Sequence, residues 1–337
     1  MPKTIRNKYF KSLTYEKLIE AHIKARKGKG YRKEIIEFNL KQEEYIMWLL
    51  EKLKNKTYKH GGYTEFYVTE PKLRRIEKSR YIDRIVHRWV VDNFLEPYFV
   101  PTFISTSYAC LKNKGMHKAA IYVKETMRHC KRTWGEYYIL KMDVAKYFDN
   151  INKNILLEIL KRKIKDIDLL WLIKQILFAQ KRGKGLEIGN YTSQMFANIY
   201  LNETDQYIKQ KLKVKYYCRY LDDSIVIVKT KKEAKEILKK IRCFLKQNLE
   251  LELNKKTQIF KNKQGVNFCG YKINEYRMKL RDKGKRKLKK KVKLLKSKIK
   301  NGELTSKEAK KYLAGHFGYI KIANVNNLLE KLFYIEK

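Results

Sequence analysis

Two adjacent acidic residues between two apolar runs are the feature that most limits how this chain can fold. Tyr216-Tyr217-Cys218 precedes Tyr220-Leu221-Asp222-Asp223, and Ile225-Val226-Ile227-Val228 follows it. Apolar runs rich in aromatic and β-branched residues on both sides of a polar turn predict a β-hairpin with two carboxylates at its tip. Neighbouring carboxylates repel each other unless a cation neutralises them, so the tip predicts a divalent metal site of the magnesium or manganese type.

A third acidic residue lies on a second predicted strand. Residues 136–143 alternate, with Tyr138, Leu140 and Met142 on one face and Asp143 on the other. Two strands that bring carboxylates to one point can hold two metal ions about 3.5–4 Å apart, as an in-line phosphoryl displacement requires. The alternative is an ordinary solvated loop, in which adjacent aspartates are common.

The charge balance points to a polyanionic partner. The 337 residues contain 79 Lys and Arg against 35 Asp and Glu, a net charge of +44. This charge is far larger than solubility requires, and it favours binding to nucleic-acid phosphates. A basic membrane-binding surface is the alternative, but no amphipathic anchor stands out, and no apolar run is long enough to cross a bilayer. The five scattered cysteines, with no C-x-x-C pair and no secretory signal before them, predict reduced thiols in the cytoplasm.

The apolar periodicity predicts an α+β chain. Helices are expected near 40–54, 83–95, 152–163, 166–180, 192–212 and 234–245, and again in the lysine-rich region after about 280. Strands are expected near 63–76, 136–145, 214–229, 251–253 and 266–271.

Four segments, taken in order, resemble the motifs of reverse transcriptases. They are Asp143 to Ile151, Tyr220-Leu-Asp222-Asp223, Leu253-Asn-Lys-Lys256-Thr257 and Phe268-Cys-Gly270-Tyr271. The resemblance covers nearly the whole chain and implies the right-hand polymerase fold. It places an N-terminal extension and the fingers at 1–135, the palm with part of the fingers (about 152–190) and the primer grip at 136–275, and a basic helical thumb at 276–337.

The same resemblance implies the catalytic residues and the cofactor. Asp143, Asp222 and Asp223, together with Val144, would bind two Mg²⁺ ions, with Mn²⁺ as the alternative. Lys256 would protonate the pyrophosphate that leaves.

The nucleotide-binding residues are expected in three further segments. Phe148 would lie under the incoming sugar, where an aromatic ring leaves no room for a 2′-hydroxyl; the alternative is that it is a core residue. Arg75, and with it Lys72, resembles the part of the fingers that clamps the triphosphate, a task suited to the guanidinium fork. Arg84 would contact the template backbone or else pair with a local acid. Tyr220, Phe268, Gly270 and Tyr271 complete the expected primer and template contacts, and Tyr108 would either stack on a base or be buried.

One segment departs from the usual family pattern. Most reverse transcriptases have glutamine before the glycine and proline after the serine, where this chain has Ile188 before Gly189 and Gln194 after Ser193. This form resembles the enzymes of diversity-generating retroelements, which copy a template repeat RNA with frequent errors at adenines. Our hypothesis is that loss of a glutamine hydrogen bond, worth on the order of 1 kcal/mol, relaxes base discrimination. The alternative is that Ile188 only packs within the palm.

This resemblance implies an RNA-directed DNA polymerase, encoded by a bacterium, an archaeon or a phage, that binds an RNA template, the RNA–DNA hybrid and deoxynucleoside triphosphates. It also implies an accessory variability protein, a basic pentameric barrel. We expect no RNase H, integrase or endonuclease domain. The alternatives are a reverse transcriptase of a retron, a group II intron or a phage-defence system, or, in another class, a catalytically inactive nucleic-acid-binding scaffold.

Overall fold

The computed structural model describes residues 3–70, 73–180 and 182–333. The chain divides into two compact units. Unit 1 comprises Met1–Ser105, Val144–Lys211 and Ile241–Glu252, and unit 2 comprises Thr106–Asp143, Leu212–Lys240 and Leu253–Lys337. Each unit therefore combines segments that are far apart in the sequence.

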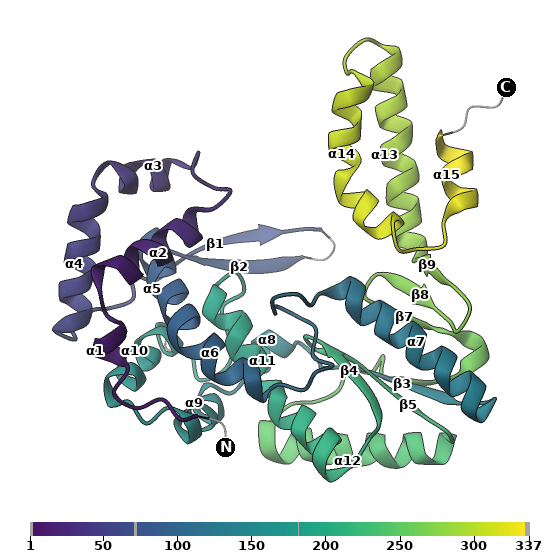
Figure 1. The fold of residues 1–337 in the computed structure, drawn as a ribbon, viewed down its shortest axis with the longest axis horizontal. Coiled ribbons are helices and arrows are strands. Elements are labelled where there is room, and N and C mark those ends of the chain that lie inside the picture. The colour runs from purple at the N-terminus through teal and green to yellow at the C-terminus, as the bar shows by residue number, and fades with distance from the viewer. Residues whose placement is uncertain (1–2, 71–72, 181, 334–337) are drawn as a thin grey trace. The chain divides into compact units, whose positions relative to one another are not determined.

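Unit 1 is mainly helical, with one two-stranded ribbon (Figure 1). Its helices before residue 105 are α1 (Tyr9–Ser12), α2 (Tyr15–Arg26), α3 (Lys33–Leu40), α4 (Gln42–Lys54), α5 (Tyr81–Val90), η1 (Val91–Leu95), α6 (Glu96–Phe99) and η2 (Val100–Thr102). Its later helices are α8 (Tyr147–Asn150), α9 (Lys153–Lys163), α10 (Ile167–Leu177), α11 (Tyr191–Gln206) and η3 (Tyr207–Lys211). The ribbon consists of β1 (Tyr63–Val68) and β2 (Arg74–Ser79), which pair in antiparallel register.

Polar side chains mark the beginning of α9 and α10 in unit 1. Asn152 caps α9 with its side-chain oxygen, and Asp166 caps α10 by accepting the Leu169 N–H at 3.1 Å. The second oxygen of Asp166 accepts the backbone N–H groups of Lys8 and Tyr9 at 2.7 and 2.9 Å. One buried carboxylate thus both starts a helix and fixes the N-terminal segment against it.

Unit 2 is built on a four-stranded antiparallel sheet. Its strands are β3 (Tyr138–Asp143), β4 (Tyr216–Tyr220), β5 (Asp223–Val228) and β6 (Gln258–Lys261), in the order β4-β5-β3-β6. Helix α7 (Met116–Trp134) lies along this sheet (Figure 1) and buries Ala119, Val123 and Met127. Helix α12 (Lys231–Leu249) starts in unit 2 and ends in unit 1.

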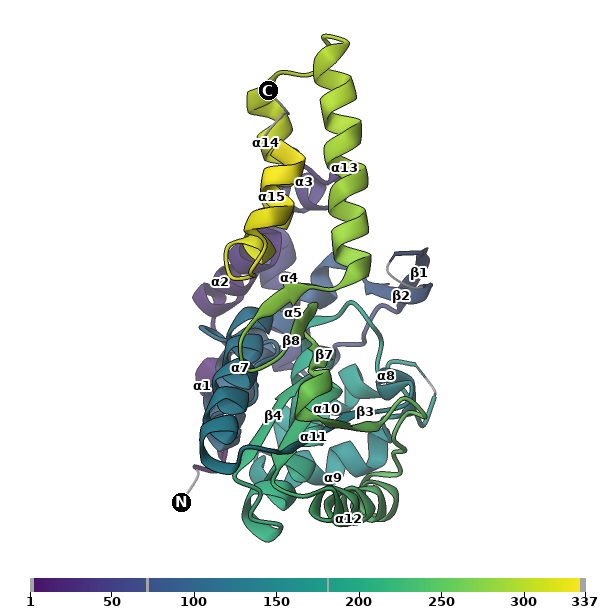
Figure 2. The ribbon, with the colours of Figure 1, turned by 90° about the vertical axis from the view of Figure 1, so that its right-hand side faces the viewer.

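A second, three-stranded antiparallel sheet leads to the C-terminal helices. It contains β7 (Val266–Phe268), β8 (Tyr271–Ile273) and β9 (Met278–Leu280), after the short turn η4 (Asn262–Gln264). The helices α13 (Asp282–Lys300), α14 (Ser306–Ile320) and α15 (Asn326–Phe333) follow, and α13 lies beside α14 (Figure 2). The first and last residue of each strand are buried and the middle one is exposed, as expected for a sheet with one face in the core.

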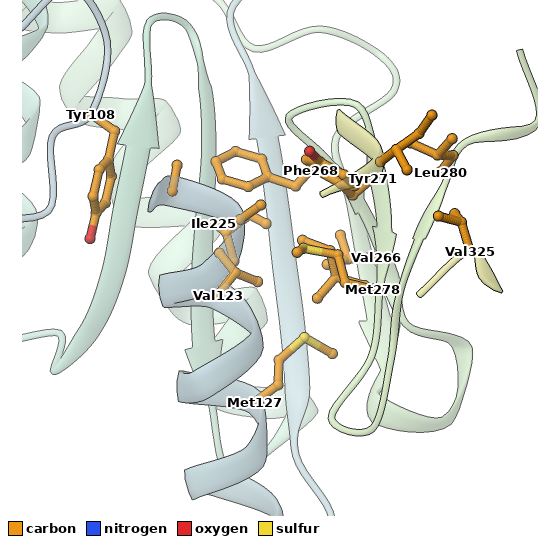
Figure 3. Close-up of a cluster of buried hydrophobic side chains, with 14 of the residues drawn as sticks. Tyr108, Val123, Met127, Ile225, Val266, Phe268, Tyr271, Met278, Leu280 and Val325 are labelled. Carbon is orange, nitrogen blue, oxygen red and sulfur yellow. The ribbon is translucent and has the colours of Figure 1, made fainter. Parts of the chain in front are cut away.

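The core of unit 2 joins both sheets and α7. Figure 3 shows Val123 and Met127 of α7 beside Ile225 of β5, with Phe268 and Tyr271 of the second sheet close by. Within the described residues, no helix combines the length and the apolar character that a bilayer crossing requires.

Candidate active site

The two adjacent aspartates lie at the tip of a tight hairpin, as predicted. Tyr220 of β4 pairs with Asp223 of β5, which leaves Leu221 and Asp222 as the turn. Leu221 has a φ of 53°, a left-handed conformation that a branched side chain rarely adopts. The guanidinium of the buried Arg219 donates to the Leu221 carbonyl at 3.0 Å and so stabilises the turn.

The third aspartate meets this hairpin through strand pairing. Asp143 is the last residue of β3 and stands opposite Asp223, the first residue of β5, in antiparallel register. Burial, and the nearby carboxylates of Asp143 and Asp222, raise the pKa of Asp223 to about 7. Lys141 opposes this shift, because its Nζ lies 3.2 Å from Asp223 Oδ2. The three acidic residues are thus electrostatically coupled at one end of the sheet.

The residues at this position suit a divalent cation. The other oxygen of Asp223, Oδ1, is buried and has no hydrogen-bond partner among the described residues. A buried carboxylate oxygen without a partner is costly, and a cation would satisfy it. Carboxylates are the ligands that Mg²⁺ and Mn²⁺ prefer. In the described part of the chain, no three or more acidic, histidine or cysteine side chains lie close enough together to form a complete metal site, and this includes the three aspartates.

The turn that carries Lys256 is attached to Asp143. The Asn254 N–H donates to the Asp143 carbonyl at 2.7 Å, and the Asn254 side chain accepts the Lys256 N–H at 3.0 Å. Lys256 itself is exposed. Val144, the next residue after Asp143, is buried and belongs to unit 1.

Unit 1 collects the residues expected to bind the nucleotide. The Leu186 N–H donates to the Phe148 carbonyl at 2.8 Å, and the Glu77 N–H donates to the Ile188 carbonyl at 3.1 Å. The loop that ends in Gly189 is therefore bonded to α8 on one side and to β2 on the other. Phe148 and Ile188 are both half-buried, and Gln194, on the first turn of α11, is exposed.

The expected clamp arginine lies on the same ribbon. Arg75 forms ion pairs with Glu65 and, at 3.2 Å, with Glu77. The guanidinium is half-exposed, so an anion in solution can reach it. Lys72, the second residue expected there, lies outside the described residues.

The residues expected to contact primer and template have mixed positions. Phe268 and Tyr271 are buried in the core of unit 2, and the turn between them, which includes Gly270, reaches the surface; a grip on the primer by this hairpin stays a prediction about its backbone. Tyr220 is half-buried beside this core. Arg84 pairs with Glu34 at 2.7 Å, the local-acid alternative, and its contact with template stays a prediction. Tyr108 is buried, which also agrees with the second alternative stated for it.

Sequence reasoning missed three polar residues that support these groups. Lys141 could have been found, because it stands two residues before Asp143 and so shares its face of β3. Arg219 and Glu77 carry no such signal, because their partners are a turn carbonyl and residues more than 100 positions away.

A strongly basic hollow lies on the second sheet of unit 2. Its volume is about 560 Å³, and it extends along the exposed side of β7–β9 to the start of α13. Seven basic residues line it: Lys263, Lys272, Arg277, Lys279, Arg281, Lys283 and Lys285. A concave surface with this charge favours phosphate backbones.

Comparison with known proteins gives consistent results. Residues 64–273, more than half of the chain, match the family "Reverse transcriptase (RNA-dependent DNA polymerase)". Protein YkfC of Escherichia coli is 27% identical over 60% of this chain and 63% of its own. The group II intron-encoded protein LtrA of Lactococcus lactis is 24% identical over 68% of this chain and 50% of its own. The chain thus spans less than two thirds of the length of either relative.

Solved structures show the same likeness in the fold. The telomerase of Candida tropicalis, solved with a fragment of telomeric RNA, has a TM-score of 0.51 at 15% identity and covers 82% of this chain and 56% of that one. The corresponding telomerase of Candida albicans has a TM-score of 0.50 at 11% identity, over 76% and 55%. The expected α+β, right-hand polymerase fold is confirmed. With the family match over residues 64–273, we conclude that this chain belongs to the reverse transcriptases.

Proposed function

We propose that the chain is an RNA-directed DNA polymerase that copies an RNA template into complementary DNA. The observation that carries this proposal is the pairing of Asp143 with Asp223, beside Asp222 at the hairpin tip. Carboxylates from two strands at one end of a sheet suit the transfer of a nucleotidyl group. Membership of the reverse transcriptase family supports the choice of substrates.

In this proposal the three aspartates, Val144 and Lys256 carry the chemistry. Asp143, Val144, Asp222 and Asp223 would hold two Mg²⁺ ions, or Mn²⁺, which when bound activate the primer hydroxyl and stabilise charge on the leaving group. Lys256 supplies a proton to the pyrophosphate. Lys141 holds Asp223 in place through its contact at 3.2 Å.

The residues of unit 1 select the deoxynucleotide. Arg75 binds triphosphate oxygens, with Lys72 as a second cation. Phe148 excludes a 2′-hydroxyl by its bulk. Ile188, Gly189 and Gln194 belong to the segment that contacts the incoming nucleotide. The hydrogen bonds that join Phe148 and Glu77 to this loop support a common task for these residues.

For the type of reverse transcriptase, we propose the diversity-generating kind, with adenine-directed errors. The support is the pair Ile188 and Gln194. Ile188 stands where most reverse transcriptases have a glutamine, and Gln194, where most have a proline, is exposed at the start of α11. Its partners would be a template repeat RNA and a basic pentameric accessory variability protein. The five cysteines, none of them in a disulfide, support a cytoplasmic location.

A group II intron reverse transcriptase is the second candidate. The observation that favours it is the similarity to LtrA, a group II intron-encoded protein, over 68% of this chain. The two candidates differ in their errors. Complementary DNA made on an RNA template with many adenines should carry mismatches concentrated at adenines if the first is correct, and mismatches spread over all four bases if the second is.

Primer extension on an RNA template with Mg²⁺ tests the activity itself. We expect the wild-type protein to extend a DNA primer and Asp222→Asn to abolish extension. The matched control is Glu158→Gln, which also changes one carboxylate to an amide, at an exposed position of α9. An inactive wild-type protein with both Mg²⁺ and Mn²⁺ would leave the inactive scaffold as the correct interpretation.

A further inference from the structure

Glu77 of β2 is a buried carboxylate at the meeting point of three cationic or amide side chains. It is 5% exposed, and Arg182 donates to both of its oxygens at 2.8 Å. Gln180 donates to Oε1 at 3.0 Å, and Arg75 lies 3.2 Å from the same oxygen. Both oxygens of Glu77 are thus satisfied by charge-assisted bonds, which are the strong ones.

The backbone of Glu77 is joined to the loop as well. Its N–H donates to the Ile188 carbonyl at 3.1 Å, and its carbonyl accepts from the Asn190 side chain at 3.4 Å. Asn190 is the N-cap of α11, yet among the described residues its side chain bonds to β2 and makes no capping bond to its own helix. The start of α11 is therefore attached to β2 at the expense of an ordinary cap.

Packing at Gly189 leaves no spare room between loop and strand. Gly189 has a φ of 121°, and a Cβ there would lie 3.0 Å from Ile76 Cγ2. Any residue other than glycine would be strained by this conformation and would also force the Ile76 side chain of β2 to shift. The loop and β2 are thus in contact over residues 188–190, with Glu77 at the centre.

Stability alone does not account for this arrangement. Glu77 is buried, whereas the side chains of Arg75 and Arg182 are 45% and 44% exposed, so solvent screens the attraction while the carboxylate still loses its hydration. What such a network does supply is one defined geometry with directional bonds. The geometry defined here includes both the carbonyl of Ile188 and the guanidinium of Arg75.

We propose that Glu77 is a positioning residue for nucleotide selection. It fixes the Ile188–Gly189 turn through its backbone and through Arg182, and it orients Arg75 on the same face of the ribbon. Glu65 and Glu77 stand directly opposite each other in the β1–β2 register, and Arg75 bridges these two like charges. This inference rests on the proposed function. It identifies Glu77 as the residue that sets the spacing between Arg75 and the Ile188–Gly189 turn.

The test compares Glu77→Gln with Glu65→Gln. Both remove one carboxylate partner of Arg75, but among the described residues only Glu77 also bonds to Gln180 and Arg182. Hydrogen–deuterium exchange of peptides spanning 73–80 and 182–190 reports on the turn without any need for activity. We expect faster exchange in both peptides for Glu77→Gln and unchanged exchange at 182–190 for Glu65→Gln.

Single-nucleotide incorporation then separates positioning from folding. For Glu77→Gln we expect KM for the deoxynucleoside triphosphate to rise about tenfold, the scale of a small misplacement, with kcat changed less than twofold. Unchanged exchange in the turn, or an unchanged KM with faster exchange, would overturn the inference. If the wild-type protein does not extend primers at all, the proposed function fails, and the exchange data still decide whether Glu77 positions the turn.

Discussion

The three aspartates of unit 2 and the residues of unit 1 that we expect to bind the nucleotide are held in place in different ways. Asp143 and Asp223 are placed by a ladder of backbone hydrogen bonds between β3 and β5, so the spacing of their backbones is set by strand pairing, and Lys141 adds one side-chain contact to Asp223. Ile188 and Arg75 are placed by a loop and an exposed ribbon that side chains connect. The difference suggests that the chemical step is robust to substitution nearby, whereas selection of the nucleotide is easily altered.

The largest effect is expected at the acidic group. Asp143→Asn keeps the strand pairing but removes a charge that metal ions need, so turnover should fall on the order of a thousandfold or more. Affinity for the RNA template should stay within about twofold, because the basic surface is untouched. Steady-state primer extension and RNA binding at fixed salt measure the two quantities. If the variant retains half of the wild-type turnover, the chemical step does not depend on the aspartates of unit 2.

At the clamp, the expected change is in KM rather than in turnover. Arg75→Ala removes charge-assisted bonds to the triphosphate, so KM should rise roughly 10- to 100-fold. Lys78→Ala is the matched control, because Lys78 lies on the same strand and pairs with Glu34. Titration of a deoxynucleoside triphosphate in single-turnover extension decides the matter; equal effects of the two variants would exclude a specific role for Arg75.

Phe148 should act on the sugar alone. Phe148→Ala opens space for a 2′-hydroxyl, so discrimination against ribonucleotides should weaken at least about tenfold. Incorporation of the matching deoxynucleotide is the internal control and should change little. If both nucleotides lose efficiency together, Phe148 is the core residue of the alternative interpretation.

The smallest effect concerns the choice of base. Ile188→Gln should lower misincorporation opposite adenine several-fold, because one amide hydrogen bond is worth on the order of 1 kcal/mol. Ile36→Gln, at an exposed apolar position of α3 in the same unit, serves as the control. Sequencing of the complementary DNA from both variants gives the error at each base. An error spectrum identical to that of the wild type would leave Ile188 as a packing residue.

Alternation in one strand and continuous apolar runs in the hairpin made much of the sheet predictable. The strands around Asp143 and Asp223 show apolar runs of the right length, and β3 and β5 lie inside the predicted ranges. Of the strand expected at 251–253, only Leu253 forms a β-bridge, and the strand that pairs with β3 on this side is β6, Gln258–Lys261. Helix α7 was not predicted, although its buried residues Ala120, Val123, Met127 and Cys130 recur at helical spacing and the pattern could have been recognised.

The contacts between distant segments could not be predicted. Glu77 meets Arg182 across more than 100 positions, and a single acidic residue on a strand looks the same in the sequence whether it faces solvent or a distant arginine. Lys141 was within reach of pattern reasoning, since it shares a face with Asp143. Sequence motifs therefore located the groups of residues, and the structure supplied the bonds that connect their members within each unit.

Leu221 has a wider consequence for the tip that carries Asp222. A leucine at a φ of 53° holds on the order of 1 kcal/mol of conformational energy that glycine would not. A glycine there would relieve this strain, but it would also give the backbone beside Asp222 more conformational freedom. The hairpin thus keeps a small conformational strain at the position where a more flexible backbone would displace the Asp222 carboxylate.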